Sequence, residues 1–114
     1  PLAAPRLDGE YRIANVTVTD INTNKRIHLE HVDLRPVLDR IAAGRKDPHR
    51  NDGTVFRNSS RLLPQRPQGY YREYVIRTPG ISGPGPQRLI LGRDGEVYYT
   101  HDHYETFITV KGGT

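Results

Sequence analysis

The sequence predicts an α+β domain in which one N-terminal helix packs on an antiparallel β-sheet. Three observations lead to this fold class. Residues 33–44 have the apolar spacing of an amphipathic helix, and the segments around them are short β-type runs separated by turn residues. The chain has 114 residues, the usual size of one domain with one core. We therefore expect a flexible arm over residues 1–8 and a single domain over residues 9–114.

An N-terminal β-hairpin is expected before the helix. Residues 11–19 alternate with β-branched side chains, which is typical of a strand. Asn22, Thr23 and Asn24 supply turn chemistry, because their short polar side chains bond to nearby backbone groups. Residues 26–30 can then return as the second strand.

The sequence predicts where the helix begins, where it ends and which of its faces is apolar. Asp33 is the expected N-cap residue, and Pro36 is acceptable in the first turn. Gly44 suits the C-terminal stop. The apolar residues between them fall at positions i, i+3, i+4 and i+7 and form one stripe: Leu34, Val37, Leu38 and Ile41.

The second half of the chain has the pattern of an antiparallel meander. Loops rich in Asn, Ser, Gly and Pro separate its strands, and the pair Asp94-Gly95 indicates a hairpin turn. A helix followed by such a meander favours the α+β class. The expected strands are residues 54–56, 70–78, 87–91, 97–100 and 105–110.

Charge and missing residue types limit the classes of function. Lys and Arg number 17 against 13 Asp and Glu, which gives a net charge of +4 and favours anionic partners such as phosphates. The absence of cysteine excludes disulfides and thiolate metal sites. We expect no metal and no cofactor, and no apolar run approaches the ~18 residues of a membrane span. The remaining metal candidates lack a standard ligand spacing: His28, His31, His49 and His101.

Three side chains in the meander form a candidate acid–base set. Glu73 lies in one expected strand, Arg88 in the next, and His103 at the corner between the last two strands. Transesterification of RNA needs a base for the 2′-hydroxyl proton, an acid for the departing 5′-oxygen and a cation for the phosphoryl oxygens. These positions can converge on one face of a meander. Taken singly, they are also compatible with a strand glutamate, a salt-bridge arginine and a turn histidine.

A series of short segments has a specific order and spacing. They are residues 52–58 (DGTVFRN), 63–64 (LP), 69–74 (GYYREY), 78–80 (TPG), 87–90 (QRLI) and 98–107 (YYTHDHYETF). By this series the chain resembles the microbial guanyl-specific ribonucleases, the family of barnase and the Streptomyces enzymes. The resemblance covers roughly half of the chain, from about Asn51 to Val110. The first 50 residues show no such motif beyond a helix in the expected place.

The resemblance implies roles for individual residues. It makes Glu73 the general base, His103 the general acid and Arg88 a phosphate-binding arginine, in a reaction that passes through a 2′,3′-cyclic phosphate without metal. Tyr104 matches an aromatic residue that lines the site. The loop that binds the guanine base matches Phe56, Arg57, Asn58, Ser59 and Ser60.

Two positions depart from the family pattern. Pro84 stands where the family has a second phosphate-binding arginine, and Ser60 stands where it has the glutamate that grips guanine. A serine cannot accept both hydrogen bonds of the guanine edge, so we expect weaker catalysis and a looser base preference. Residues 73, 75 and 77 share one face of an extended strand. Arg77 is therefore expected to replace part of the missing arginine; the alternative is a solvated arginine at the strand end.

The sequence thus predicts a monomeric endoribonuclease acting on single-stranded RNA. The alternative is a non-catalytic RNA- or protein-binding module on the same fold, which the departures at Ser60 and Pro84 support. The chain contains no methionine, which indicates a mature secreted enzyme or the C-terminal toxin module of a larger bacterial effector, delivered into a target cell's cytoplasm. In the second setting we expect an acidic inhibitor, or immunity protein, as a partner of the basic surface.

Overall fold

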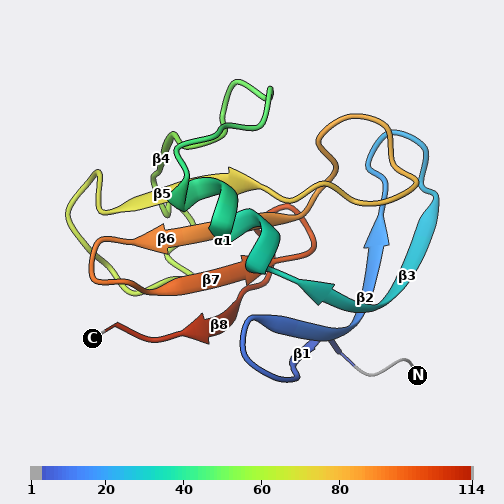
Figure 1. Ribbon diagram of the computed structural model, residues 1–114, viewed down its shortest axis with the longest axis horizontal. Helices are drawn as coiled ribbons and strands as arrows, with labels where there is room; N and C mark the ends of the chain where they lie inside the picture. Colours follow the sequence, from blue (N-terminus) through green and yellow to red (C-terminus); the bar gives the residue numbers. More distant parts are fainter. Residues whose placement is uncertain (1–3, 114) are drawn as a thin grey trace.

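The computed structural model describes residues 4–113 and confirms the α+β fold class. The strands form two antiparallel sheets, ordered β1-β2-β3 and β4-β5-β6-β7-β8, and α1 lies over one face of the larger sheet (Figure 1). In chain order the elements are β1 (Arg6–Leu7), β2 (Arg12–Thr19), β3 (Arg26–Asp33), α1 (Arg35–Ala42), β4 (Val55–Phe56), β5 (Tyr71–Val75), β6 (Arg88–Gly92), β7 (Val97–Thr100) and β8 (Ile108–Lys111).

The hairpin of β2 and β3 is present where the sequence predicts it. Its turn is held by the Asp20 carboxylate, which accepts a hydrogen bond of 2.9 Å from the backbone N–H of Asn22. Asn24 adopts a left-handed conformation with φ 62°, which asparagine tolerates. β3 continues to Asp33, three residues beyond the expected end, because the ladder with β2 extends to the pair Arg12↔Asp33.

The arm before β2 is partly ordered, unlike the flexible segment predicted for residues 1–8. Arg6 and Leu7 form β1 and pair with Ala14 and Ile13 of β2. The free edge of β2 offers unpaired backbone groups, and a short strand satisfies them. Residues 1–3 of the predicted arm lie outside the described residues.

The helix begins slightly later than the sequence predicts. Leu34 is the N-cap residue, and Asp33 stands one position earlier, where its carboxylate accepts a hydrogen bond of 3.0 Å from the N–H of Arg35. The helix ends at Ala42, and Gly44 follows in a left-handed conformation with φ 73°. The predicted stripe is confirmed: Leu34 is fully buried, and the other apolar residues pack against the same core, namely Val37, Leu38 and Ile41.

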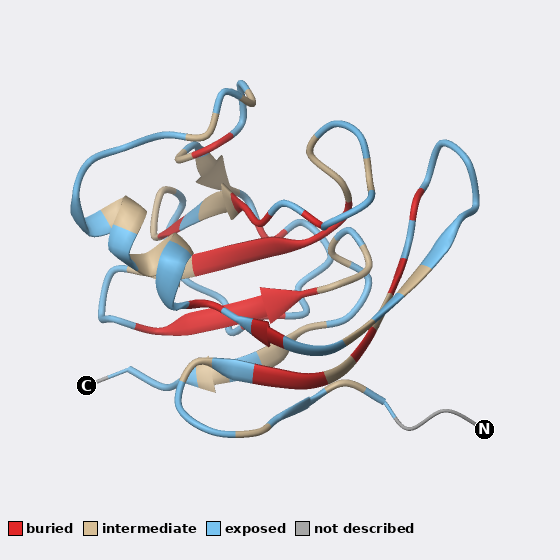
Figure 2. Cartoon of the chain, turned by 45° about the vertical axis from the view of Figure 1, so that its right-hand side comes forward, coloured by how far each residue is buried: buried red, intermediate tan, exposed pale blue. Residues whose placement is uncertain are grey.

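The five-stranded sheet separates two apolar clusters. The larger lies between this sheet, α1 and the hairpin, and it includes Leu89 and Tyr99. The smaller covers the opposite face and includes Ile90 and Tyr98. In Figure 2 the central strands of the sheet are red, whereas the tip of the β2–β3 hairpin is pale blue. Because Glu73 pairs with Ile90, it shares the face opposite α1.

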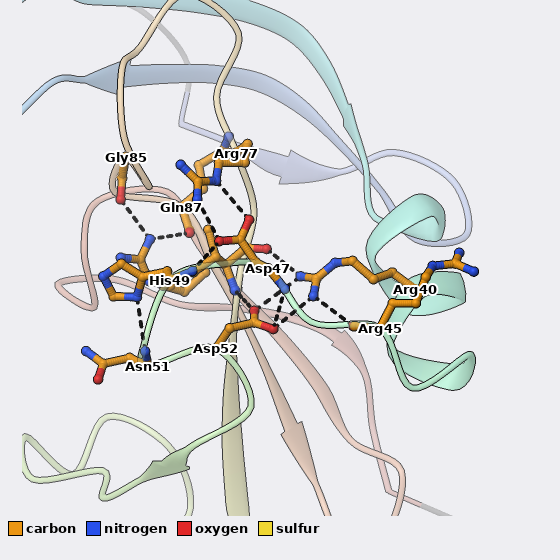
Figure 3. A network of polar contacts seen from close by, with 11 residues as sticks. Arg40, Arg45, Asp47, His49, Asn51, Asp52, Arg77, Gly85 and Gln87 are labelled. Carbon is orange, nitrogen blue, oxygen red and sulfur yellow. Dashed lines mark hydrogen bonds and ion pairs between the residues drawn. The ribbon is translucent and has the colours of Figure 1, made fainter.

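A buried carboxylate ties the loop after α1 to the sheet. The Asp52 side chain is fully buried and accepts hydrogen bonds of 2.9 and 3.2 Å from Arg40 of α1. It also accepts bonds from the backbone N–H groups of Val75 (2.8 Å) and Asp47 (3.0 Å). Figure 3 shows this network, in which one side chain joins the helix, the loop and β5.

Candidate active site

Glu73 occupies the middle of β5 on the sheet face opposite α1. Its backbone is fixed to the segment before β4, since its N–H donates to the carbonyl of Thr54 (2.9 Å) and its carbonyl accepts from the N–H of Gly53 (2.7 Å). Its Oε1 accepts a hydrogen bond of 2.6 Å from the Tyr104 hydroxyl. Within residues 4–113 no hydrogen bond reaches Oε2, which leaves this oxygen available to accept a proton.

Arg88 begins β6 and is only 3% exposed. Its Nη1 donates hydrogen bonds of 2.7 Å to the carbonyls of Gly85 and Gln87. Its buried Nε has no partner among the described residues. A buried guanidinium with an unbonded donor is costly, and its positive charge makes Arg88 a candidate for holding an anion at this site.

His103 and Tyr104 lie together in the connection between β7 and β8. Both adopt left-handed backbone conformations, with φ 55° and 74°, which non-glycine residues adopt only when the surroundings impose them. The N–H of His103 donates to the carbonyl of Pro86 at 3.1 Å. The N–H of Tyr104 donates to the Thr100 hydroxyl at 3.1 Å. These bonds fix the turn from which Tyr104 reaches Glu73, with the His103 ring beside the Tyr104 ring.

The Asp102 side chain stabilises the β7–β8 connection through hydrogen bonds to residues of the same segment. Its carboxylate accepts hydrogen bonds from the Thr100 hydroxyl (2.8 Å) and from the N–H and hydroxyl of Thr106 (2.9 and 2.7 Å). Burial acts to raise the pKa of Asp102, but these hydrogen bonds outweigh it and leave the pKa below its ordinary value. The charged Asp102 therefore supports the strained turn that carries the catalytic candidates.

The Tyr104 side chain connects the members of the site. Its ring stacks on Phe56 with centroids 5.4 Å apart, meets the His103 ring edge-on at 4.7 Å, and lies 6.0 Å from the Arg88 guanidinium carbon. Burial, together with the hydrogen bond to Glu73, raises the pKa of the Tyr104 phenol. The phenol therefore stays protonated at neutral pH and orients the carboxylate as a donor.

The charge state of His103 is tuned by its neighbours. Burial lowers the pKa of His103 below its ordinary 6.5, and the Arg88 cation lowers it further. The carboxylates of Glu73 and Glu105 act in the opposite direction.

We expect the His103 ring signals in an NMR pH titration to give a pKa below 6.5. The variant Glu73→Gln should lower this pKa further, because it removes a negative charge and leaves the Arg88 cation less opposed. Glu30→Gln, an exposed change on β3, serves as the control and should leave the pKa unchanged. An unshifted titration in Glu73→Gln would show that the two groups do not interact.

The loop after β4 has its shape set by Asn58. This residue is buried and left-handed, with φ 56°. Its side-chain amide donates to the carbonyl of Leu63 (2.9 Å) and its Oδ1 accepts from the N–H of the same residue (3.1 Å). An asparagine amide can imitate a backbone turn in this way, so it closes the loop over residues 58–63.

A cavity of about 310 Å³ lies beside this loop. Ser60 does not line it, but the other residues assigned to base binding do: Phe56, Arg57, Asn58 and Ser59. Arg61 and Arg66 also line the cavity; sequence reasoning did not single them out, because an exposed arginine in a loop has no distinguishing pattern. None of the described lining residues carries a carboxylate.

Arg77 is held in an ion pair beyond the end of β5. β5 ends at Val75, so the strand alternation behind the prediction does not reach residue 77. The Arg77 guanidinium instead donates two hydrogen bonds of 2.8 and 2.6 Å to Asp47 (Figure 3), and this pairing lowers the pKa of Asp47 to about 2. The structure thus corrects the expectation that Arg77 replaces the arginine missing at Pro84.

The fold and the site together define a class of protein: a small α+β domain with a carboxylate and a buried arginine on one sheet face and an imidazole in the adjoining turn. The model of the ribonuclease family matches residues 13–111, so the chain belongs to the ribonuclease family. This confirms the resemblance found in the sequence and extends it over the hairpin and α1.

Individual relatives agree with this assignment. The chain is 45% identical to guanyl-specific ribonuclease St of Saccharopolyspora erythraea, over 59% of this chain and 66% of that protein. It is 45% identical to guanyl-specific ribonuclease Sa of Kitasatospora aureofaciens, over 61% and 74%, and 46% identical to ribonuclease Sa3 of the same organism, of which it spans 50%. A solved structure of ribonuclease Sa2 complexes with mononucleotides shares 37% identity and a TM-score of 0.64, covering 68% of this chain and 81% of that one.

Proposed function

We propose that this protein is an endoribonuclease that cleaves single-stranded RNA by metal-independent transesterification through a 2′,3′-cyclic phosphate. Glu73 is the base and His103 is the acid. One observation carries the proposal: Tyr104 contacts Glu73, His103 and Phe56 at once, beside a buried Arg88 whose Nε lacks a partner. An acid, a base and an anion site around one aromatic residue suit a phosphodiester.

In the proposed reaction the chain's own residues move both protons. Glu73 takes the 2′-hydroxyl proton through Oε2 while the 2′-oxygen attacks phosphorus. The bond from phosphorus to the 5′-oxygen breaks, and His103 gives its proton to that oxygen. The Arg88 guanidinium holds the non-bridging oxygens as their charge grows. In the second step water opens the cyclic phosphate, with His103 as base and Glu73 as acid.

The relatives support the substrate class. The curated relatives are named guanyl-specific ribonucleases, and the similar solved structure holds mononucleotides. In this chain the cavity beside Asn58 lies next to Phe56, which also stacks on Tyr104. A nucleotide phosphate at Arg88 would therefore have its base near this cavity.

The first test is cleavage of a defined single-stranded RNA in excess EDTA. We expect full cleavage with 2′,3′-cyclic phosphate ends, identified by mass spectrometry, because the acid and the base are both protein side chains. Glu73→Gln protein purified in parallel controls for contaminating nucleases. Loss of activity in EDTA that a divalent cation restores would contradict the proposal, and binding without cleavage would favour a non-catalytic module.

Base preference is proposed to be looser than in the family. We expect Ser60→Glu to raise the ratio of cleavage after G to cleavage after A about tenfold, because a carboxylate accepts two hydrogen bonds from the guanine edge. Ser60→Gln, of the same size but with a single acceptor oxygen, is the matched control and should change the ratio less. A natural protein that already cuts only after G would show that other groups read the base.

We further propose that the protein acts outside the cell that makes it. It would be secreted as a monomer or delivered as the toxin module of a larger bacterial effector. The net charge of +4 suits an acidic inhibitor in the producing cell, one that covers Arg88 and His103. Co-expression with the product of the neighbouring gene tests this, since an inhibitor should abolish cleavage and bind with an affinity that falls with salt.

A further inference from the structure

The N-terminal hairpin forms one wall of a second cavity, which His103 also lines but Glu73 and Arg88 do not. The cavity has a volume of about 340 Å³, within the range of about 300–1,000 Å³ that is typical of small-ligand sites. His103 lines it directly. From the hairpin come Thr17, Thr19, Ile21 and Asn24, and from the opposite side come Pro86, His101, Asp102 and Glu105.

This wall is a fixed part of the fold. Val16 and Val18 of β2 are fully buried in the main core, and alternation along the strand turns Thr17 and Thr19 to the other side. Beside them the hairpin packs on the loop between β5 and β6 (Figure 1), where Ile27 lies directly against Gly80. The same loop holds the His103 backbone through Pro86. Both walls of the cavity are therefore anchored to one loop.

The chemistry of transesterification indicates what lies on this side. The attacking 2′-oxygen and the departing 5′-oxygen take opposite sides of the phosphorus atom in an in-line displacement. The general base therefore lies on the side of the upstream nucleoside, and the general acid lies on the side of the departing nucleoside. With Glu73 as base and His103 as acid, the nucleoside downstream of the scissile bond leaves past His103, which is where the hairpin cavity lies.

We propose that the cavity between the β2–β3 hairpin and His103 binds the nucleoside downstream of the scissile phosphate, with Ile21 as its apolar contact. This inference rests on the proposed ribonuclease function. Ile21 is 64% exposed, and an exposed isoleucine beside hydroxyl and amide groups can contact a flat base while its neighbours bond to the base edge or ribose.

The lining favours a nucleoside over a second phosphate. Among the described lining residues there is no Lys or Arg, and two carboxylates are present, those of Asp102 and Glu105. A further phosphate here would meet two carboxylates and no Lys or Arg side chain. An uncharged base and ribose meet no such cost.

The test compares two substrates that differ only in the downstream group. One is a dinucleoside monophosphate with guanosine on the 5′ side, and the other is the methyl ester of guanosine 3′-phosphate. The measured quantity is kcat/KM for the dinucleoside monophosphate divided by kcat/KM for the methyl ester. We expect this ratio to fall about threefold in Ile21→Ala and about tenfold in Ile21→Asp, the range for losing a small apolar contact or adding an unfavourable charge. Leu7→Ala, another exposed apolar residue outside the cavity, is the matched control and should leave the ratio unchanged.

A binding measurement separates this inference from the proposed activity. The 2′-deoxy form of the dinucleotide cannot be cleaved because it lacks the nucleophile. We expect it to shift the NMR signals of the Ile21 methyl groups, whereas 2′-deoxyguanosine 3′-phosphate should not. An unchanged kcat/KM ratio in both Ile21 variants, together with unshifted Ile21 signals, would overturn the inference. Wild-type protein that cleaves neither substrate yet shows the Ile21 shift would overturn the proposed function and leave the nucleoside site standing.

Discussion

Replacing Glu73 with Gln is expected to lower kcat for RNA cleavage by at least ~10²-fold, the usual contribution of a general acid–base group. The amide cannot take the 2′-hydroxyl proton, yet its oxygen can still accept the hydrogen bond that Tyr104 donates to Oε1. The geometry of the site is therefore kept while the base is removed. His103→Ala should lower kcat by a similar factor, because the departing 5′-oxygen loses its proton donor. Single-turnover cleavage of a short RNA measures both effects.

The double variant distinguishes a shared mechanism from two separate defects. Glu73 and His103 act on the same displacement, so the double variant should lose less than the product of the two single losses. Glu30→Gln, exposed on β3, should retain wild-type kcat. Thermal unfolding of each variant establishes that it is folded. Near-wild-type cleavage by either single variant would remove that residue from the proposed mechanism.

The largest expected effect on stability is that of Asp52→Ala. It removes a fully buried carboxylate that receives bonds from Arg40, Val75 and Asp47. Arg40 loses its counter-charge while it stays mostly buried, with a side chain 19% exposed. We expect the free energy of unfolding in urea to fall by about 3–5 kcal/mol, as when one partner of a buried pair is removed.

The exposed Asp39 of α1 provides the control for this change. Asp39→Ala should alter the free energy of unfolding by less than about 0.5 kcal/mol, as surface substitutions usually do. An Asp52→Ala variant as stable as wild type would show that the network does not hold the loop to the sheet.

The same network predicts how stability depends on pH. Burial acts to raise the pKa of Asp52, but the bonds from Arg40 and the backbone lower it below the ordinary 3.8. The unfolded chain therefore binds a proton at higher pH than the folded one. The stabilisation is complete above the unfolded value and is lost as the pH falls through the folded one. Urea unfolding below pH 4 should show a weaker acid dependence in Asp52→Ala than in wild type.

Several features of the fold could be predicted because they depend on neighbours in the sequence. The stripe from Leu34 to Ile41 and the Asp94-Gly95 turn are local patterns, and α1 and the β6–β7 hairpin stand where these patterns put them. The predicted N-cap was one residue early, because Asp33 bonds to the N–H of Arg35 from the position before the N-cap residue Leu34.

The candidate catalytic trio could also be located from the sequence. In a meander, register follows from strand order and side-chain alternation, which brings Glu73 and Arg88 to the same face. The prediction from side-chain alternation was wrong for Arg77, because β5 ends two residues before it. Where its side chain goes depends on Asp47, which is 30 positions away in the chain and carries no local signal for this pairing.

The sequence by itself thus determined the α+β class and the order of the elements from β2 onward, and it predicted the residues of the candidate acid–base site. Only the tertiary structure decided that Arg88 is buried with an unbonded Nε, that Tyr104 joins Glu73 to His103, and that the hairpin forms a cavity beside the acid. The physical reason is the range of the interactions. Propensity and alternation act over a few residues, whereas burial, hydrogen-bond partners and cavities arise between segments that meet only when the chain has folded.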